Sequence, residues 1–169
     1  VIMLMLTTSD NTASLWLQSL AGTGTRINKI LDSIGYLATR VNSRTPGRES
    51  NREKFGWGQT SPKEMVSFFE QLANRTLLDA ASSEKMLRLL GRNYWDEEAI
   101  SQIPPDVFVA SKNGAVNASR SEAMYVSGKK AKYVFCICTK NNKDISWESN
   151  NEAWELARKV SKLLWDTYQ

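Results

Sequence analysis

The sequence predicts an α/β protein of the α+β kind, in which a helical lobe precedes a three-strand antiparallel meander and one closing helix. Apolar residues recur at helical spacing before Pro104-Pro105, and this double proline ends the helical pattern. Short apolar and β-branched runs joined by Gly, Asn and Lys turns follow, and the chain ends in an amphipathic stretch. With 169 residues, of which 41% are hydrophobic and 24% charged, the chain is long enough to bury one core.

The first residues are predicted to form short helices. Val1 to Leu6 is an apolar run too short to span a membrane, and no basic region precedes it as in a signal peptide. It starts without a cap, so we expect the chain to be the carboxyl-terminal part of something larger. A short buried helix is predicted from Asn11 to Leu20, after the capping residues 7–10, and a second from Thr25 to Ser33, closed by Gly35.

Helical periodicity disappears between residues 36 and 59, where polar, charged and turn-forming residues dominate. A structureless segment of this length inside a compact domain is more often functional, or packed as an Ω-loop, than a simple linker. We therefore expect an Ω-loop at residues 36–59, within a helical lobe that spans residues 1–105.

Two more helices and a short turn complete this lobe. Thr60-Ser61-Pro62 supplies a cap and a first-turn proline for a helix whose buried face runs from Met65 to Leu72. A second helix is predicted from Ser82 to Gly91, and residues 94–103 are predicted to form a short helix or turn.

Residues 106–169 are predicted to hold the strands and the terminal helix. The three strands are expected at residues 107–111, 121–127 and 132–139. Asn150 to Tyr168 is predicted to be an amphipathic helix whose tryptophans pack against the sheet and do not contact a cofactor.

Composition excludes several classes of site. The chain has no histidine, which excludes Ser-His-Asp and Cys-His catalysis and every histidine metal site. The net charge of +4 is mild, and the basic cluster at residues 129–132 is interpreted as a solvated turn, so no nucleic-acid partner is expected. Cys136 and Cys138 lie two apart on a strand, share a face, and are expected to be buried and reduced, not a disulfide, redox or metal pair.

Two short motifs carry the chemistry of the chain. In Ser111-Lys112-Asn113-Gly114, a lysine is followed by a small polar residue and a glycine at the end of a strand. Such a strand can bind an anionic substrate through charge, side chain and backbone together. Ser9-Asp10-Asn11 heads a helix. In isolation, the first motif is an ordinary strand end and the second an ordinary helix cap.

In this order and context, the two motifs resemble those of the class A β-lactamase and penicillin-binding-protein family of serine hydrolases. The resemblance extends over nearly all of the chain. It is carried by residues 9–13, S-D-N-T-A, by residues 39–42 at the start of the Ω-loop, by Thr60-Ser61-Pro62 with Met65 in the next helix, and by Lys112-Asn113-Gly114, which is similar to K-[ST]-G.

The resemblance implies a hydrolase that needs no cofactor. In this family, a serine attacks the amide carbonyl of a β-lactam or of a peptidoglycan stem peptide, and a lysine helps to move its proton. By resemblance, Ser9 would pass a proton to the leaving nitrogen, Asn11 would hydrogen-bond the side-chain amide of the substrate, and Asp10 would be structural.

The strand motif would bind the other end of the substrate. By resemblance, Lys112 would raise the local positive potential, favouring both substrate carboxylate binding and ionisation of the nucleophile. Gly114 would let the substrate backbone approach the strand edge, and Arg120 could add a second cation for the carboxylate. Asn113 replaces the family's hydroxyl residue, and its amide can still donate to a carboxylate, with a different reach.

The nucleophile is missing from this chain. In the family, an S-x-x-K motif that carries the nucleophile precedes S-D-N, and no such motif precedes Ser9. Ser82-Ser83-Glu84-Lys85 has the right spacing but follows the Ω-loop, so we interpret it as a helix cap and a surface lysine.

The Ω-loop also departs from the family pattern. Residues 43–49 align on their proline with the family's R-W-E-P-E-L-N and put Thr45 where a glutamate would activate water, although threonine has no pKa suited to a general base. Glu49 falls at the family's asparagine position, where it could reach the same water, but its side chain is expected to pair with Arg44, Arg48 or Arg52.

Two functions remain open at this point. The full-length parent is either a β-lactamase-like serine hydrolase, inactive as this fragment, or a non-catalytic binding module with the same fold. The expected partners are a β-lactam or peptide substrate, and the missing amino-terminal half or a second copy of the chain. Family members are usually exported, which implies a periplasmic or extracellular location.

Overall fold

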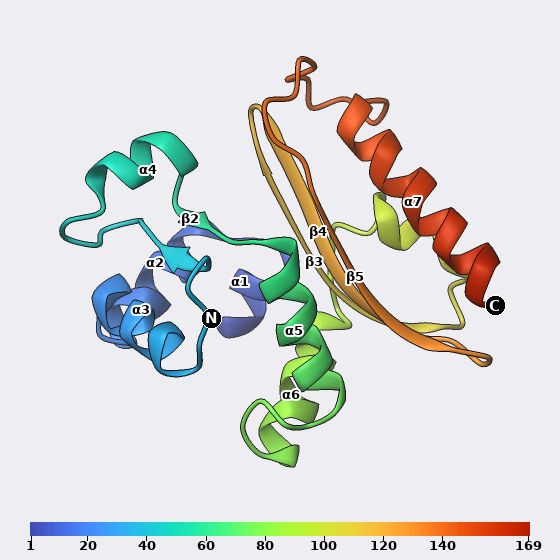
Figure 1. Cartoon of the computed structure of the whole chain (residues 1–169), viewed down its shortest axis with the longest axis horizontal. Coiled ribbons are helices and arrows are strands. Elements are labelled where there is room, and N and C mark those ends of the chain that lie inside the picture. Colours follow the sequence, from blue (N-terminus) through green and yellow to red (C-terminus); the bar gives the residue numbers. More distant parts are fainter.

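The computed structural model describes residues 1–169 and places a three-stranded sheet between a helical lobe and a terminal helix (Figure 1). The lobe holds α1 (Ile2–Thr7), α2 (Asn11–Leu20), α3 (Thr23–Ser33), α4 (Glu49–Phe55), α5 (Pro62–Ala73) and α6 (Ala80–Leu90), with the short strands β1 (Arg40–Val41) and β2 (Gly58–Gln59). The 3-10 helix η1 (Ala99–Gln102) leads to β3 (Phe108–Val116), β4 (Ser119–Ser127), β5 (Lys132–Cys138) and α7 (Glu152–Tyr168). The predicted α+β architecture is confirmed.

Side-chain caps mark the starts of α2, α5, α6 and α7, and the sequence indicates the caps of α2 and α5. Asp10 accepts a hydrogen bond from the Ala13 amide at 2.6 Å at the start of α2, and Ser61 accepts one from the Glu64 amide at 3.3 Å at the start of α5. For α6, however, the cap is Asp79, and Ser82 lies in the first turn. The interpretation of Ser82 as a cap is therefore wrong, because the helix begins earlier than predicted and the carboxylate of Asp79, three residues before Ser82, caps it.

The segment 36–59 is more ordered than its sequence indicates. Its ends are joined by the antiparallel pairing of β1 with β2, as expected of an Ω-loop, but α4 forms within it. The amides of Ala38 and Thr39 donate to the Glu64 carboxylate of α5, at 2.8 and 2.6 Å. The expectation of a structureless segment is wrong because α4 has no buried residue, so it leaves no apolar periodicity in the sequence.

The predicted three-strand meander is confirmed, with strand order β3-β4-β5 and antiparallel pairing throughout. The first two strands are longer than expected: β3 continues to Val116 and β4 starts at Ser119, so the expected loop shrinks to Asn117-Ala118. One face packs on α5 and α6 through Ala110 and Ala123. The opposite face packs on η1 and α7. We call these the lobe face and the α7 face.

The terminal helix α7 covers its face of the sheet as predicted (Figure 1). Trp154 is 7% exposed and packs with Val109, Met124 and Val126, which confirms its structural role. No helix of the chain is long and apolar enough to cross a membrane.

Both cysteines lie on the edge strand β5 as free thiols, with sulfur atoms 3.7 Å apart. Cys136 is half-buried against the lobe and Cys138 is exposed. The expectation that both are buried is therefore wrong, because β5 forms the outer edge of this sheet and the lobe covers only part of it.

Candidate functional site

The structure brings the two sequence motifs together. The Lys112 Nζ of β3 donates a hydrogen bond to the Ser9 Oγ, although the two residues are 103 positions apart in the chain. The same ammonium donates to the Asn113 carbonyl at 2.6 Å, and the Asn113 Oδ1 lies 3.4 Å away. A serine hydroxyl, a lysine ammonium and an amide therefore meet between the helical lobe and the sheet.

Ser9 occupies the turn between α1 and α2 in an unusual backbone conformation. Its φ is +57°, in the left-handed region that costs most residues other than glycine about 1–2 kcal/mol. The side chain is exposed, whereas the Asp10 carboxylate is occupied by the Ala13 amide and holds the start of α2. Asp10 thus caps α2, and Ser9 presents its hydroxyl to Lys112.

The surroundings of Lys112 disfavour its charged form, because the side chain is partly withdrawn from water. Burial of the side chain lowers the pKa of the Lys112 ammonium, and the negative charge of Glu122 partly opposes that shift. A lysine with a lowered pKa exchanges a proton more readily near neutral pH, and a hydroxyl is the group it contacts. The pair is therefore suited to moving a proton.

Strand register decides which neighbours of Lys112 share its face of the sheet. Lys112 lies opposite Ala123, which packs on the lobe, and Asn113 lies opposite Glu122 on the α7 face. Because β3 is an edge strand, the Asn113 side chain can still bend round to the Lys112 ammonium. The structure therefore places Asn113 beside the pair, at the rim of the lobe face.

Arg120 lies elsewhere. It is opposite Ala115, on the α7 face, and is only 2% exposed. Its guanidinium donates to the Ser146 carbonyl at 2.7 Å and stacks over the ring of Trp147 at 4.7 Å. Its Nη1 donates to the carbonyls of residues 116, 117 and 119, and its buried Nε has no partner. The expectation that Arg120 places a second cation in the cleft does not hold. Its guanidinium lies on the opposite face of the sheet, where it bonds backbone carbonyls and stacks on Trp147.

Asn11 and Gly114 are both exposed and border the pair. Asn11 is the first residue of α2, two positions after Ser9, and its side chain makes no hydrogen bond within the chain. At Gly114, an added Cβ would lie only 3.0 Å from the Ser121 Oγ, so a larger residue would crowd Ser121. Both positions are open to a ligand that contacts Lys112.

In the Ω-loop, the Thr45 hydroxyl is buried and hydrogen-bonded, whereas the Glu49 carboxylate is exposed. Thr45 is 6% exposed, its hydroxyl donates to the Ser43 carbonyl at 2.9 Å, and its side chain packs against Gly24 of α3. The exposed Glu49 carboxylate accepts only the Gly47 amide, at 3.2 Å, and forms no ion pair. The expected pairing of Glu49 with an arginine is wrong, because the carboxylate turns back on its own loop.

Sequence reasoning missed Glu122, which lies behind Asn113. Its side chain is 1% exposed, its Oε2 accepts the Ala99 amide at 2.8 Å, and its Oε1 has no partner. Burial raises the pKa of this carboxyl to about 7, against the opposing effect of amide hydrogen bonds. A single acid among the apolar residues of β4 is the sequence signal that could have revealed it.

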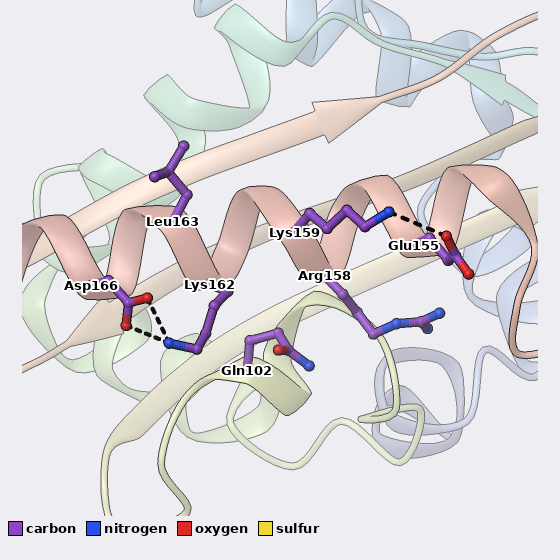
Figure 2. Close-up of a pocket in the computed structure, with 7 residues that line it drawn as sticks. All are labelled: Gln102, Glu155, Arg158, Lys159, Lys162, Leu163 and Asp166. Carbon is purple, nitrogen blue, oxygen red and sulfur yellow. Dashed lines mark hydrogen bonds and ion pairs between the residues drawn. The ribbon is translucent and has the colours of Figure 1, made fainter.

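One surface hollow is unrelated to this pair. It has a volume of about 660 Å³ and is lined by α7 and by Gln102 of η1, and Figure 2 shows its charged side chains. Lys159 pairs with Glu155 at 3.3 Å and Lys162 with Asp166 at 2.5 Å, so the charges are matched within the helix. No group of three or more Cys, Asp or Glu side chains in the chain is placed to hold a metal ion.

We compared the sequence of the chain with family models and its fold with solved structures. The family model described as the beta-lactamase enzyme family matches residues 1–168. The solved structure of PBP-A is similar over 98% of this chain, with a TM-score of 0.82 and 19% identity. The chromosome-encoded beta-lactamase of Vibrio parahaemolyticus is similar over 99%, with a TM-score of 0.77 and 23% identity. A beta-lactamase from Chitinophaga pinensis is similar over 99%, with a TM-score of 0.81 and 15% identity.

The chain spans 59% of PBP-A and 63% of each of the two beta-lactamases. No curated protein matches it in sequence. The solved structures establish the fold, and the family model covers nearly every residue, so this chain belongs to the beta-lactamase enzyme family.

Proposed function

We propose that this chain supplies one wall of an acyl-serine hydrolase site that acts on a β-lactam or on a peptidoglycan stem peptide. The observation that carries the proposal is the hydrogen bond from the Lys112 ammonium to the Ser9 hydroxyl. It joins, in space, the two motifs that the family uses for proton transfer and for binding of a substrate carboxylate. Membership of the family supports the same reaction class.

The proposed division of labour follows from the positions of the side chains. Lys112 attracts the substrate carboxylate and exchanges a proton with Ser9, which passes it to the leaving nitrogen. Asn11 is free to hydrogen-bond the substrate, and Asn113 donates to its carboxylate at the rim. The exposed edge of β3 at Gly114 accepts the substrate backbone.

The attacking serine would come from an S-x-x-K segment outside residues 1–169. Residues 1–105, with the Ω-loop at 36–59, and residues 106–169 would then be the carboxyl-terminal portion of a single domain. The missing portion, or a second copy of this chain, would complete the cleft. We place the complete protein in the periplasm or outside a bacterial cell, where peptidoglycan is accessible.

Binding of benzylpenicillin to the 169-residue chain tests the proposal without requiring the nucleophile. In an NMR titration, the amide shifts that change should be those of Ser9, Asn11 and residues 112–114. Lys112→Met keeps the length of the side chain but removes its charge, and it should abolish these changes. Lys132→Met, at the exposed start of β5, is the matched control and should retain them.

Equal binding by Lys112→Met and by the unchanged chain would overturn the proposed role of Lys112. Mass spectrometry adds a second criterion. The 169-residue chain should form no penicilloyl adduct, whereas a longer form that carries S-x-x-K before Val1 should form one on that serine. An adduct on residues 1–169 would contradict the assignment of the nucleophile to another segment.

The second candidate function is a non-catalytic binding module. The buried hydroxyl of Thr45, at the position of the family's water-activating glutamate, favours this alternative, because it leaves no base for deacylation there. The longer form separates the two functions: a module would bind benzylpenicillin reversibly with no adduct, and a hydrolase would become acylated.

A further inference from the structure

The segment that follows α6 contacts both halves of the Ser9–Lys112 pair. The Asn93 Nδ2 donates to the Ser111 Oγ at 2.9 Å, directly before Lys112 in β3. The Trp95 indole Nε1 donates to the Thr8 carbonyl at 3.0 Å, directly before Ser9. Residues 93–95 therefore connect the strand that carries the lysine to the turn that carries the serine.

The segment is itself held rigid. The Asn93 Oδ1 accepts a hydrogen bond from the Trp95 backbone amide at 3.3 Å, and the Asn93 Nδ2 donates one to the Trp95 carbonyl at 3.1 Å. These two bonds hold residues 93–95 in a tight turn. The Tyr94 amide donates to the Thr7 carbonyl at 2.9 Å, and the Tyr94 and Trp95 rings meet edge to face at 5.1 Å. A rigid segment of this kind can keep Thr8 and Ser111, which it contacts at its two ends, at a fixed distance from each other.

The contact to Thr8 acts on the conformation of Ser9. The Thr8 carbonyl and the Ser9 amide belong to one planar peptide unit, so a donor on that carbonyl orients the plane from which the Ser9 φ is measured. Ser9 has a φ of +57°, a conformation that persists only when surrounding contacts enforce it. The Trp95 indole is one of those contacts.

The contact to Ser111 acts on the position of Lys112. β3 is an edge strand and pairs with β4 alone, so its free side needs other contacts to fix it. The Ser111 side chain is fully buried, and its hydroxyl accepts a hydrogen bond from the Asn93 amide. Lys112 is the next residue, and its Nζ reaches Ser9 across the gap between lobe and sheet.

We infer that residues 93–95 form a clasp in which Asn93 and Trp95 are positioning residues: together they hold Ser9 and Lys112 at hydrogen-bonding distance. This role rests on the proposed function, since it concerns the pair that the proposal uses. Neither residue touches the pair with a reactive group of its own. Each acts through a backbone or side-chain contact to the neighbour of Ser9 or of Lys112.

The test is an NMR titration of the Lys112 side chain in the complete 169-residue chain. Trp95→Phe keeps an aromatic ring and removes only the indole donor. It should increase the hydration of Lys112, move the pKa of its ammonium up toward the ordinary lysine value, and shift the Ser9 amide resonance. Ser111→Ala, which removes the acceptor at the other end of the clasp, should change both readouts in the same direction.

Trp147→Phe is the matched control, because Trp147 is also exposed, makes no indole hydrogen bond and lies on the α7 side of the sheet. It should leave the pKa of Lys112 and the Ser9 resonance unchanged. If Trp95→Phe and Ser111→Ala both fold and both leave these readouts as they are in the unchanged chain, the clasp is disproved. If Trp95→Phe does not fold, Ser111→Ala decides alone.

These readouts need no ligand, which separates the clasp from the function it serves. A chain that binds no benzylpenicillin but shows the expected changes in Lys112 would refute the proposed function and retain the clasp. If Trp95→Phe, Ser111→Ala and Trp147→Phe all bind benzylpenicillin as well as the unchanged chain, and the pKa of Lys112 is the same in each, the proposed function is retained and the clasp is refuted.

Discussion

The two faces of the β3-β4-β5 sheet each hold a cation, and they treat it in opposite ways. On the α7 face, Arg120 is buried, its two Nη groups donate to backbone carbonyls, and its guanidinium stacks on Trp147. On the lobe face, Lys112 keeps a hydroxyl and a rim amide as its neighbours and remains half-buried. The first cation is built into the fold, whereas the second remains available to a ligand.

The largest expected effect is on the α7 face. Arg120→Met should lower the free energy of unfolding by about 3 kcal/mol or more, because it leaves several carbonyls without a donor and removes a stacked cation. Urea denaturation at neutral pH measures the loss. Arg75→Met, which breaks an exposed ion pair with Glu84, should cost less than about 1 kcal/mol. A similar small cost at Arg120 would mean that its carbonyl contacts do not stabilise the fold.

The buried acid behind Asn113 should make stability depend on pH. The pKa of Glu122 is raised from 4.5 to about 7, so the folded state binds a proton more tightly than the unfolded state. Its contribution is fully present below pH 4.5, and the free energy of unfolding should fall by up to about 3 kcal/mol as the pH rises to about 7.

Glu122→Gln should reduce this slope in urea denaturation curves recorded between pH 4.5 and 8. A residual slope should remain, because burial also raises the pKa of Glu98, which acts in the same direction. Glu155→Gln, at an exposed position of α7, is the control and should keep the original slope. An unchanged slope in Glu122→Gln would show that this carboxyl is not the titrating group.

The smallest expected effect is on the lobe face. Lys112→Met should change the free energy of unfolding at pH 7 by no more than about 1 kcal/mol, with stabilisation as the favoured sign, because burial already disfavours the charged lysine. The same urea experiment measures it. A loss as large as that of Arg120→Met would make Lys112 a structural cation and remove the contrast between the two faces.

The structure brings together Lys112 and Ser9, whose two motifs the sequence assigns to one cleft, and it places Arg120 on the opposite face of the sheet. The order of the two motifs and their resemblance to the family predict that Ser9 and Lys112 share one cleft. This prediction does not depend on the length of the turn between β3 and β4. The face of Arg120, by contrast, depends on that turn: Asn117-Ala118 sets Arg120 opposite Ala115, and a slip of one residue would move it to the lobe face. The apolar pattern of the two strands does not determine the length of the turn between them to within one residue.

Other features escaped prediction because they depend on the path of the chain in space. The short helix α4 has no buried face, and the Asn93 and Trp95 contacts join residues 18 and 87 positions apart. Neither leaves a periodic signal. The helix starts at Asp10 and Ser61 were predictable, since a cap needs only its immediate neighbours in sequence.

A buried side-chain pair ties the Ω-loop to the helix that follows Ser9. The Gln18 side chain of α2 donates a hydrogen bond to the Ser43 carbonyl and accepts one from the Ser43 hydroxyl. Breaking either bond while its atoms stay buried would cost about 1–3 kcal/mol. The loop and α2 should therefore exchange their amide hydrogens as one cooperative unit.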